Sequence, residues 1–359
     1  MSLKVLGWDI GGANIKAAFV AVFNGRIVDC RTHVKYFPIW ESNLEALPQA
    51  LQDVSNFLTK NGEVDMVSVS MTAELSDVFK TKEEGVKCIL KCVKNVSRRL
   101  NPLVINFNGE LLDFKKAQKN PLSVSGANWA ATAKVCSTIF KDCVLIDVGS
   151  TTTDIIAIRE SKVSVSEHTD MGRLSSGELV YTGALRSSIS SIVSYIPVRG
   201  RDTDVSSESF ASTGDVHLIL GNIKRKEYTT ETADGRGTSK RACFERLARV
   251  VCADSTMLTD SEIKEMASNI YSKQVDKISR GLEKLTRGFS LRKRQTLPIV
   301  VTGLGGQFLG AEAAFELGFR KTFNLGSIVG VEDPQVIAAF STAILVAASR
   351  GESIQWFTC

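Results

Sequence analysis

An aspartate followed closely by two glycines is the first feature of the chain that suggests chemistry. Asp9 stands near the end of an apolar run, and Gly11 and Gly12 follow it. Paired glycines let the backbone turn tightly, so amide hydrogens can approach phosphate oxygens without an intervening Cβ. We expect Gly11, Gly12 and Asn14 to bind phosphate, Asp9 to hold a hydrated magnesium ion, and Lys16 to act as a point charge toward an anion. Alone, the pattern is equally typical of a plain hairpin.

A second aspartate precedes a turn rich in hydroxyl groups. Asp147 is followed by one glycine, four hydroxyl residues and then Asp154. Consecutive hydroxyls suit hydrogen bonds to phosphate oxygens, whereas a plain hairpin turn favours Asn-Gly. We therefore expect Asp147 and Asp154 to act with Asp9 and Lys16 as catalytic residues, and the three aspartates to bind metal. The expected phosphate ligands of this second loop are Gly149, Ser150, Thr151 and Thr152.

A third glycine-rich turn lies late in the chain. Gly303-Leu304-Gly305-Gly306 follows an apolar strand and precedes a helical pattern. Backbone amides at the start of a helix favour negative charge, so we expect Gly305 and Gly306 to bind phosphate. The spacing differs from Gly-x-Gly-x-x-Gly, and the acidic residue of a dinucleotide site is missing at its usual distance.

The periodicity of apolar residues places these loops on two similar hairpins. Strands are predicted over 4–10, 15–23, 26–36 and 64–70, with Asn24-Gly25 as a hairpin turn. Helices are predicted over 44–58 and 83–100. The series restarts with strands over 143–148, 154–159 and 162–168, so Asp9 and Asp147 occupy equivalent positions 138 residues apart, since 147 − 9 = 138. This predicts a duplicated β-β-β-α-β-α unit.

The remaining patterns complete two lobes. Residues 171–240 are rich in Gly, Ser and Thr and predict loops and short helices. Later segments predict helices over 241–253, 261–287, 307–317 and 335–349, and strands over 297–302 and 321–325. We assign residues 1–140 to a first lobe, on which a closing segment, 335–359, packs, and residues 141–334 to a second lobe.

Composition limits the function classes. With 359 residues, 43% hydrophobic and 23% charged, the chain suits two globular domains, and a net charge of +5 suits small anions better than nucleic acid. The beginning of the sequence lacks a signal-peptide pattern, and the longest apolar run, 336–348, is too short for a bilayer. Eight scattered cysteines favour free thiols over zinc. We expect a cytoplasmic protein without nucleic-acid or membrane partners, and a homodimer is one open oligomeric state.

Together the three loops resemble the actin-like ATPase superfamily, which includes sugar kinases and acetate kinase. The resemblance covers nearly the whole chain in order and spacing. It implies a two-lobed, ribonuclease H-like α/β fold with a cleft between the lobes. In that superfamily the first hairpin of each lobe carries a phosphate loop, and a late glycine turn contacts the nucleotide.

A narrower resemblance rests on the segments around the loops. These segments are 71–79, 125–132, 172–183, 213–217 and 232–236. They look like the ether-forming transferases of methanofuran biosynthesis, a branch of the hydantoinase/oxoprolinase-like proteins. The resemblance implies transfer of an aminomethylfuran-methyl group from its diphosphate to the phenol of γ-glutamyltyramine, with release of diphosphate; from the charge of that leaving group we expect Mg²⁺ as the cofactor.

The same segments supply the candidate substrate ligands. Glu74 and Asp77 follow a strand end, where cleft residues are expected, and Arg236 could meet the glutamyl carboxylate of the acceptor. Asn128 suits a helix cap as well as a ligand contact. The complete candidate set is Glu74, Asp77, Asn128, Glu178, Asp234 and Arg236. Lone histidines such as His168 and His217 are more often structural.

Two other functions stay open. An ATP-dependent kinase or amidohydrolase of the same fold would use the same loops for a nucleotide. A non-catalytic nucleotide-binding regulator or scaffold would need fewer carboxylates than these loops carry. True hydantoinases and oxoprolinases have a carboxylate where this chain has Lys16, which counts against ATP-dependent ring opening.

Overall fold

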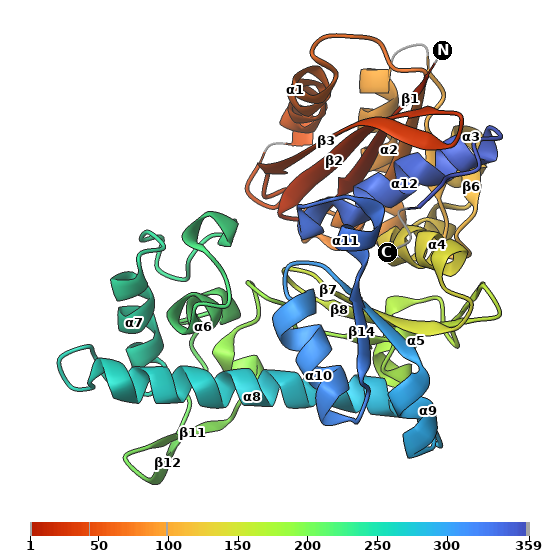
Figure 1. Ribbon diagram of the computed structural model, residues 1–359. Helices are drawn as coiled ribbons and strands as arrows, with labels where there is room; N and C mark the ends of the chain where they lie inside the picture. The colour runs from red at the N-terminus through yellow and green to blue at the C-terminus, as the bar shows by residue number, and fades with distance from the viewer. Residues whose placement is uncertain (1, 43, 98–99, 357–359) are drawn as a thin grey trace. The chain divides into compact units, whose positions relative to one another are not determined.

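The protein divides into two compact units. The computed structural model describes residues 2–42, 44–97 and 100–356. Unit 1 comprises Met1–Cys143, Ile158–Ser164 and Leu325–Cys359, and unit 2 comprises Val144–Ala157 and Val165–Asn324. The C-terminal part of unit 1 thus starts ten residues before the closing segment that we assigned to the first lobe. Figure 1 labels the elements of both units.

Unit 1 is built on a six-stranded sheet in the order β3-β2-β1-β4-β5-β6. Its strands are β1 (Leu3–Ile10), β2 (Asn14–Phe23), β3 (Arg26–Tyr36), β4 (Met66–Met71), β5 (Leu103–Ile105) and β6 (Leu111–Asp113). β1 runs antiparallel to β2 and parallel to β4, so β1 and β4 end at the same edge. Asn24 and Gly25 both have positive φ and join β2 to β3, as the sequence predicts.

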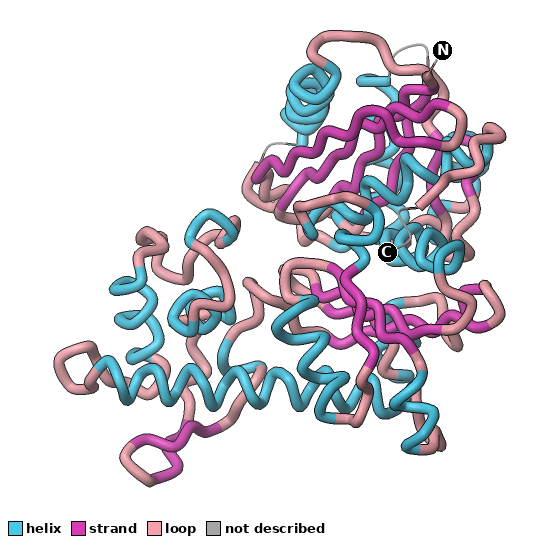
Figure 2. The backbone as a smooth tube through the Cα atoms, in the orientation of Figure 1, coloured by secondary structure: helices cyan, strands magenta, loops and turns pink. Residues whose placement is uncertain are grey.

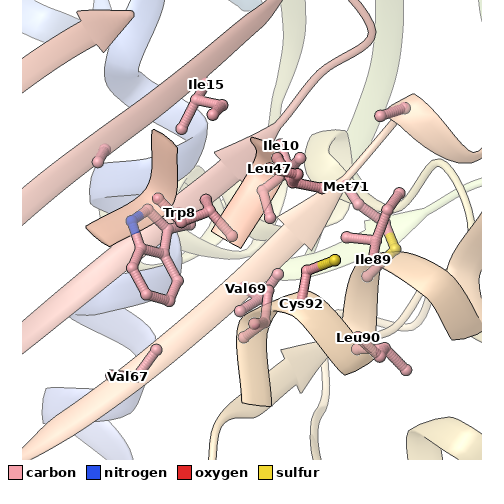
Figure 3. Packing of buried hydrophobic residues seen from close by; sticks show 14 of the residues in the cluster. Trp8, Ile10, Ile15, Leu47, Val67, Val69, Met71, Ile89, Leu90 and Cys92 are labelled. Carbon is pink, nitrogen blue, oxygen red and sulfur yellow. The ribbon is translucent and has the colours of Figure 1, made fainter. Parts of the chain in front are cut away.

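Helices cover both faces of this sheet. Alternate side chains of β1, such as Trp8, pack with α1 (Leu47–Thr59) and α2 (Lys82–Ser97), and Figure 3 shows Trp8, Val69 and Met71 in this core. The other face packs against α12 (Ile337–Ser349), which in turn packs against α4 (Asn128–Ile139). The Ser68 hydroxyl of β4 donates to Thr342 Oγ1 of α12 over 3.0 Å. Gly7 of β1 faces α12, because a Cβ at this position would meet Ala339 and Thr342 of that helix. Since side chains alternate along a strand, Asp9 points to the same face.

Shorter elements complete unit 1. They are η1 (Leu44–Ala46), η2 (Ala73–Leu75), α3 (Phe114–Lys119), η3 (Pro121–Ser123), β9 (Lys162–Ser164), α11 (Leu325–Val329) and η7 (Pro334–Val336). The predicted strand over 162–168 ends at Ser164, and β5 and β6 were not predicted. The helix predicted over 83–100 ends at Ser97, and residues 98–99 lie outside the described residues.

Unit 2 repeats the strand order around a second sheet. The order is β10-β8-β7-β13-β14, and β9 also pairs with β8. The strands are β7 (Cys143–Val148), β8 (Thr153–Arg159), β10 (Leu179–Val180), β13 (Pro298–Thr302) and β14 (Lys321–Asn324). In both sheets the first strand has its hairpin partner on one side and a parallel strand on the other, which is β4 beside β1 and β13 beside β7. The predicted duplication and the actin-like α/β class are confirmed.

The helices of unit 2 pack against one face of its sheet and extend beyond it. The longest is α8 (Asp260–Leu285), which with α10 (Ala311–Glu316) covers β7 and β13. The first half of α8 shares a second core with α6 (Thr213–Leu220) and α7 (Lys240–Arg249), and Figure 2 shows this helical region joined by loops. The other elements are α5 (Asp170–Ser176), η4 (Ile189–Ser191), β11 (Tyr195–Val198), β12 (Arg201–Asp204), η5 (Arg225–Glu227), α9 (Leu291–Thr296) and the π-helical turn η6 (Gly306–Gly310).

Several features of unit 2 differ from the prediction. The hairpin β11–β12 lies in the stretch predicted as loops and short helices, and turns at Arg199 and Gly200, which both have positive φ. The helix predicted over 307–317 begins as the π-turn η6 and becomes α-helical only at Ala311. Within the described residues, no helix combines the length and apolar character needed to cross a bilayer.

The contact between β1 and α12 predicts a strong effect of Gly7→Ala. A Cβ at Gly7 would overlap the carbonyl oxygen of Ala339 and lie 2.8 Å from Thr342 Oγ1. Since backbone of a packed helix must shift, we expect a loss of about 1–3 kcal/mol in the free energy of unfolding. Urea unfolding followed by circular dichroism measures it. Gly237→Ala is the matched control, because its Cβ would meet nothing within 4 Å; equal stability of the two variants would contradict the prediction.

Candidate functional site

The first loop of unit 1 starts from an ion pair. Asp9 and Lys16 face each other across the antiparallel pair β1–β2. Lys16 Nζ lies 3.4 Å from Asp9 Oδ2, and the Ser70 hydroxyl donates to Asp9 Oδ1 over 3.1 Å. The Asp9 side chain is buried, whereas about a fifth of the Lys16 side chain is exposed. The two predicted catalytic groups of this loop are therefore in contact, and their charges balance within the protein.

The turn after Asp9 is tightly held by its own backbone. The amide of Gly11 donates to the carbonyl oxygen of Asn14 over 3.0 Å, and the carbonyl of Gly12 accepts from Ile39. A Cβ on Gly12 would lie 3.2 Å from Ser76 Oγ. The buried Asn14 Oδ1 has no hydrogen-bond partner in the described part of the chain. As an acceptor, this oxygen suits a cation or a donor group, whereas the phosphate contact that we predicted would have to use the amide nitrogen.

The end of β4 brings two of the predicted substrate ligands near this loop. Thr72 donates its amide to the carbonyl of Ile10, so β4 continues beside the turn. Glu74 in η2 is buried, and its Oε1 accepts from the Ser125 hydroxyl over 2.7 Å. Asp77 is exposed. The structure thus joins the segments around 74 and 125, which the sequence only showed separately.

Asn128 acts at the start of α4. Its Oδ1 accepts from the amide of Trp129 over 2.9 Å, although the N-cap residue itself is Ala127. The side chain is partly exposed. The Asn128 side-chain oxygen therefore has a hydrogen-bond donor within the protein, and a contact of Asn128 with a ligand stays a prediction.

The second loop lies at the end of β7 in unit 2. Asp147 is half-buried, and the amide of Gly149 donates to the carbonyl of Thr152 over 2.9 Å. The Ser150, Thr151 and Thr152 side chains are partly exposed. Several hydroxyl groups therefore follow the carboxylate at one sheet edge, as predicted.

The late glycine turn packs directly on this loop. Thr302 stands beside Asp147 in the parallel pair β13–β7. Gly303 has a φ of 77°, and a Cβ there would overlap the carbonyl oxygen of Val148 and lie 2.5 Å from Asp147 Oδ1. The turn can approach so closely because it carries glycine.

The amides of this turn make hydrogen bonds within unit 2. Gly305 donates its amide to the carbonyl of Val148 over 3.0 Å, and Gly306 donates to Gly303 over 3.1 Å. The bond of Gly305 helps to fix the backbone at the start of the second loop. Phosphate binding by Gly305 and Gly306 stays a prediction.

A segment that sequence reasoning missed completes the second loop. Ala184 donates its amide to the carbonyl of Gly149, and Arg186 donates its amide to that of Ser150, both over 2.9 Å. A Cβ on Gly183 would lie 2.5 Å from the Thr151 amide nitrogen. Arg186 is exposed and brings a cation to the neighbourhood of the loop. No periodic pattern marks residues 182–187, so the sequence held no signal for this contact.

Asp154 is neutralised by an arginine. Its Oδ1 accepts from Arg173 Nη2 over 2.8 Å, and Arg173 is buried. The same Nη2 donates to the carbonyl of Glu178. A buried carboxylate is stable when it is paired in this way. The ion pair gives Asp154 a charge partner within the protein, and its roles as catalytic residue and metal ligand stay predictions.

Glu178 also has a structural role. Its buried carboxylate accepts from the amides of Ser166 over 2.6 Å and Glu167 over 3.3 Å. These bonds hold the chain between β9 and α5 against β10. These contacts account for the buried carboxylate, and a substrate contact of Glu178 stays a prediction.

Asp234 and Arg236 belong to an ion-pair network around α7. Asp234 accepts from Arg236 Nε over 2.7 Å, from Arg246 Nη1 over 3.1 Å and from Arg249 Nη1 over 3.3 Å. The buried Arg246 also donates to Asp215 over 2.6 Å. Partial burial raises the pKa of Asp234, but hydrogen bonds from Arg236 and the charge of Arg246 outweigh it and lower this pKa to about 2. Asp234 and Arg236 thus take part in ion pairs within unit 2, and their contacts with substrate stay predictions.

Among the described residues, no group of three or more His, Cys, Asp or Glu side chains is arranged to hold a metal ion. The described cysteines are free thiols, as expected, and Cys359 lies outside the described residues. A metal ion bound at the first or second loop would therefore need ligands besides protein side chains, such as water and substrate phosphate.

Comparison with known proteins identifies the family. The model of the family described as hydantoinase/oxoprolinase matches residues 65–348. The chain belongs to the hydantoinase/oxoprolinase family. It is also 41% identical over 313 residues to the (4-{4-[2-(gamma-L-glutamylamino)ethyl]phenoxymethyl}furan-2-yl)methanamine synthase of Methanocaldococcus jannaschii, which covers 86% of this chain and 88% of that protein. The synthase of the same name from Methanococcus vannielii is 36% identical over 215 residues, 59% of this chain and 94% of that protein.

A solved structure supports the fold of this family member. Acetone carboxylase in its nucleotide-free form aligns over 96% of this chain and 70% of its own, with a TM-score of 0.56 and 12% identity. At that identity the likeness concerns the fold alone. It agrees with the two duplicated sheets described above.

The arginine network predicts a pH-dependent effect of Asp234→Asn. The folded pKa near 2 lies below the ordinary value of 3.8, so this carboxylate stabilises the fold above pH 3.8 and loses its contribution as the pH falls through 2. Because Asp234 is exposed and solvent screens its ion pairs, we expect Asp234→Asn to lower the free energy of unfolding by about 1 kcal/mol at pH 7 and by roughly half of that at pH 3. Urea unfolding at both values measures the difference.

The control for this network is Asp276→Asn. Asp276 forms a surface pair with Lys273 on α8, with both side chains substantially exposed, and such pairs contribute little. A cost for Asp234→Asn that did not shrink on acidification would show that the carboxylate charge is not what stabilises the network.

Proposed function

We propose that this protein is the transferase that forms the phenoxymethyl-furan ether of methanofuran biosynthesis. It would join an aminomethylfuran-methyl diphosphate to the phenol of γ-glutamyltyramine and release diphosphate. The observation that carries the proposal is the 41% identity with the M. jannaschii synthase over 86% of this chain. That protein's name describes an amine in which a furan and a γ-glutamylaminoethyl-phenol are joined by such an ether.

The second loop suits the diphosphate leaving group. Its partly exposed hydroxyls can donate to phosphate oxygens, and its backbone is fixed from two sides by Gly183 and Gly303. The exposed Arg186 adds positive charge next to Ser150. A preorganised set of donors stabilises charge as it develops, because little reorganisation is needed during the reaction.

Magnesium is the cofactor we propose. Protein-bound Mg²⁺ keeps several waters and takes one or two carboxylates besides substrate phosphates, so the lack of a carboxylate cluster among the described residues fits this ion. The half-buried Asp147 is the candidate ligand in unit 2. In unit 1 the candidates are Asp9 and the Asn14 oxygen, which is buried without a described donor. When bound, Mg²⁺ would neutralise charge on the departing diphosphate oxygens.

The bond changes favour early departure of the diphosphate. The acceptor phenol has an ordinary pKa near 10, so ionising it at pH 7 costs about 4 kcal/mol. The electron-rich furan can instead stabilise positive charge on its methylene as the C–O bond to diphosphate breaks and diphosphate keeps the electron pair. The phenol oxygen then forms the new C–O bond, and its proton passes to a carboxylate. The protein would hold the donor, orient the phenol and exclude water from the methylene.

The proposed reaction can be tested directly. Purified protein is incubated with Mg²⁺, furanmethyl diphosphate bearing the aminomethyl group, and γ-glutamyltyramine. We expect mass spectrometry to detect the ether and a diphosphate assay to detect one diphosphate for each ether formed. Consumption of ATP in place of the furan diphosphate, with a phosphorylated or ring-opened product, would overturn the proposal in favour of a kinase or amidohydrolase.

Asp147→Asn tests the assigned metal ligand. Removing this charge should lower kcat by roughly a hundredfold or more, because the leaving group loses charge neutralisation, and should raise the Mg²⁺ concentration needed for half-maximal rate. EDTA should abolish product formation, and added Mg²⁺ should restore it. Asp276→Asn, on the surface of α8, should keep the wild-type Mg²⁺ dependence. An unchanged Mg²⁺ titration in Asp147→Asn would remove Asp147 from the site.

A further inference from the structure

A chain of buried polar side chains lies behind the second loop. His217 on α6, Gln274 on α8 and Thr182 are each fully buried. Gln274 Nε2 lies 2.8 Å from the carbonyl oxygen of Gly183 and 3.0 Å from Thr182 Oγ1. Its Oε1 lies 2.9 Å from His217 Nε2. These hydrogen bonds therefore connect α6 and α8 to the segment around Gly183 that packs on the second loop.

The hydrogen-bond directions follow from the groups involved. The Gly183 carbonyl can only accept, so the Gln274 amide nitrogen must face it and the Gln274 oxygen must face His217. His217 Nε2 then carries the proton. The other ring nitrogen, Nδ1, lies 3.2 Å from Asn222 Nδ2 and accepts from it. Burial lowers the pKa of His217 to about 4, which keeps the ring neutral at pH 7 in the state that these bonds require.

At Thr182 and Gly183 these hydrogen bonds reach the second loop, which we assign to diphosphate. Thr153, which follows the second loop, donates its hydroxyl to the carbonyl of Thr182 over 2.8 Å. Gly183 contacts the backbone of Ser150 and Thr151. A shift of Thr182 or Gly183 would thus move the donors of the second loop directly.

His217 and α8 also contact the segment that follows the late glycine turn. The His217 ring lies 4.7 Å, centroid to centroid, from Phe308 in η6. Tyr271, one turn before Gln274 on α8, donates its hydroxyl to the carbonyl of Phe308 over 2.7 Å. The same two helices therefore support both segments that flank the second loop.

Burying so many polar groups has an energetic cost that apolar side chains would avoid. A buried network stabilises only when its members are satisfied, and it then specifies one geometry. Here the two bonds donated by Gln274 end on Thr182 Oγ1 and on the Gly183 carbonyl, beside the second loop. The sequence singled out the segment 213–217 but suggested no role for it. These hydrogen bonds suggest that His217 supports the second loop.

We propose that His217 and Gln274 are positioning residues of the diphosphate site, which hold Thr182 and Gly183 so that the second loop presents its donors to diphosphate. The inference rests on the proposed function, because it takes diphosphate as the ligand of this loop. Neither side chain contacts the substrate in this proposal. Their effect should therefore appear in diphosphate affinity and not in acceptor affinity.

The test compares two substitutions of Gln274 in the full-length protein. Gln274→Met keeps the length of the side chain and removes its bonds. Gln274→Glu at pH 8 keeps an acceptor for His217 but, as a carboxylate, cannot donate to Gly183. Calorimetry measures the Kd of inorganic diphosphate with Mg²⁺, and steady-state kinetics measure KM for the furan diphosphate and for γ-glutamyltyramine.

We expect both variants to weaken diphosphate binding at least about tenfold, equivalent to 1.4 kcal/mol. KM for the furan diphosphate should rise by a similar factor, while KM for γ-glutamyltyramine should stay unchanged. Thr259→Ala is the control, since Thr259 caps the same helix by accepting from Glu262 and does not contact the loop. It should lower the melting temperature and leave diphosphate affinity at the wild-type value.

Three outcomes would overturn the inference. The first is wild-type diphosphate affinity in Gln274→Met. The second is wild-type affinity in Gln274→Glu alone, which would show that the bond to Gly183 is not needed, and this variant also decides the matter if Gln274→Met does not fold. The third is an equal loss in Thr259→Ala. If the wild-type protein itself does not bind diphosphate, the proposed function fails first, and the result is distinct from all three.

Discussion

Close backbone packing around the end of β7 determines the geometry of the second loop. Gly303 fills the space against Val148 and Asp147, and Gly183 lies against Thr151, so a Cβ at either glycine would overlap its neighbours. The loop is therefore held mainly by main-chain contacts, including the amides of Ala184 and Arg186 that donate to it. Its hydroxyl side chains are left at the surface of unit 2, partly exposed. A ligand-binding loop built in this way is rigid without using the groups that bind the ligand.

Charge pairing then separates three aspartates that look equivalent in the sequence. Asp9 is balanced by Lys16, and Asp154 by the buried Arg173. Asp147 instead lies half-buried beside the glycine turn. Asp147 is half-buried and Asp154 is buried, so the carboxylate of Asp147 is the more accessible of the two, and this is why we propose Asp147 as the metal ligand of unit 2.

The sequence predicted features that depend on local periodicity. Alternating apolar residues and Asn24-Gly25 were sufficient for the first hairpin, and the Asp9–Lys16 contact follows from its register. The glycine turn lies beside Asp147 because parallel strands end at one edge. Arg173 and Gly183 were not assigned to the site because they reach it through irregular segments whose position depends on tertiary packing. The backbone bonds of Gly305 and Gly306 to Val148 and Gly303 were not predicted, because such bonds leave no trace in residue type.

Lys16 shows how one residue can redirect a shared fold. The same α/β architecture aligns with acetone carboxylase at 12% identity, so the fold alone does not set the chemistry. Position 16 faces Asp9 directly across the strand pair. A carboxylate there, as in the hydantoinase and oxoprolinase pattern, would place like charges opposite each other and would require a bound cation. Lys16 supplies that positive charge from the protein itself, so Asp9 is balanced without a bound cation. An anionic leaving group bound near this loop would therefore need one bound cation fewer.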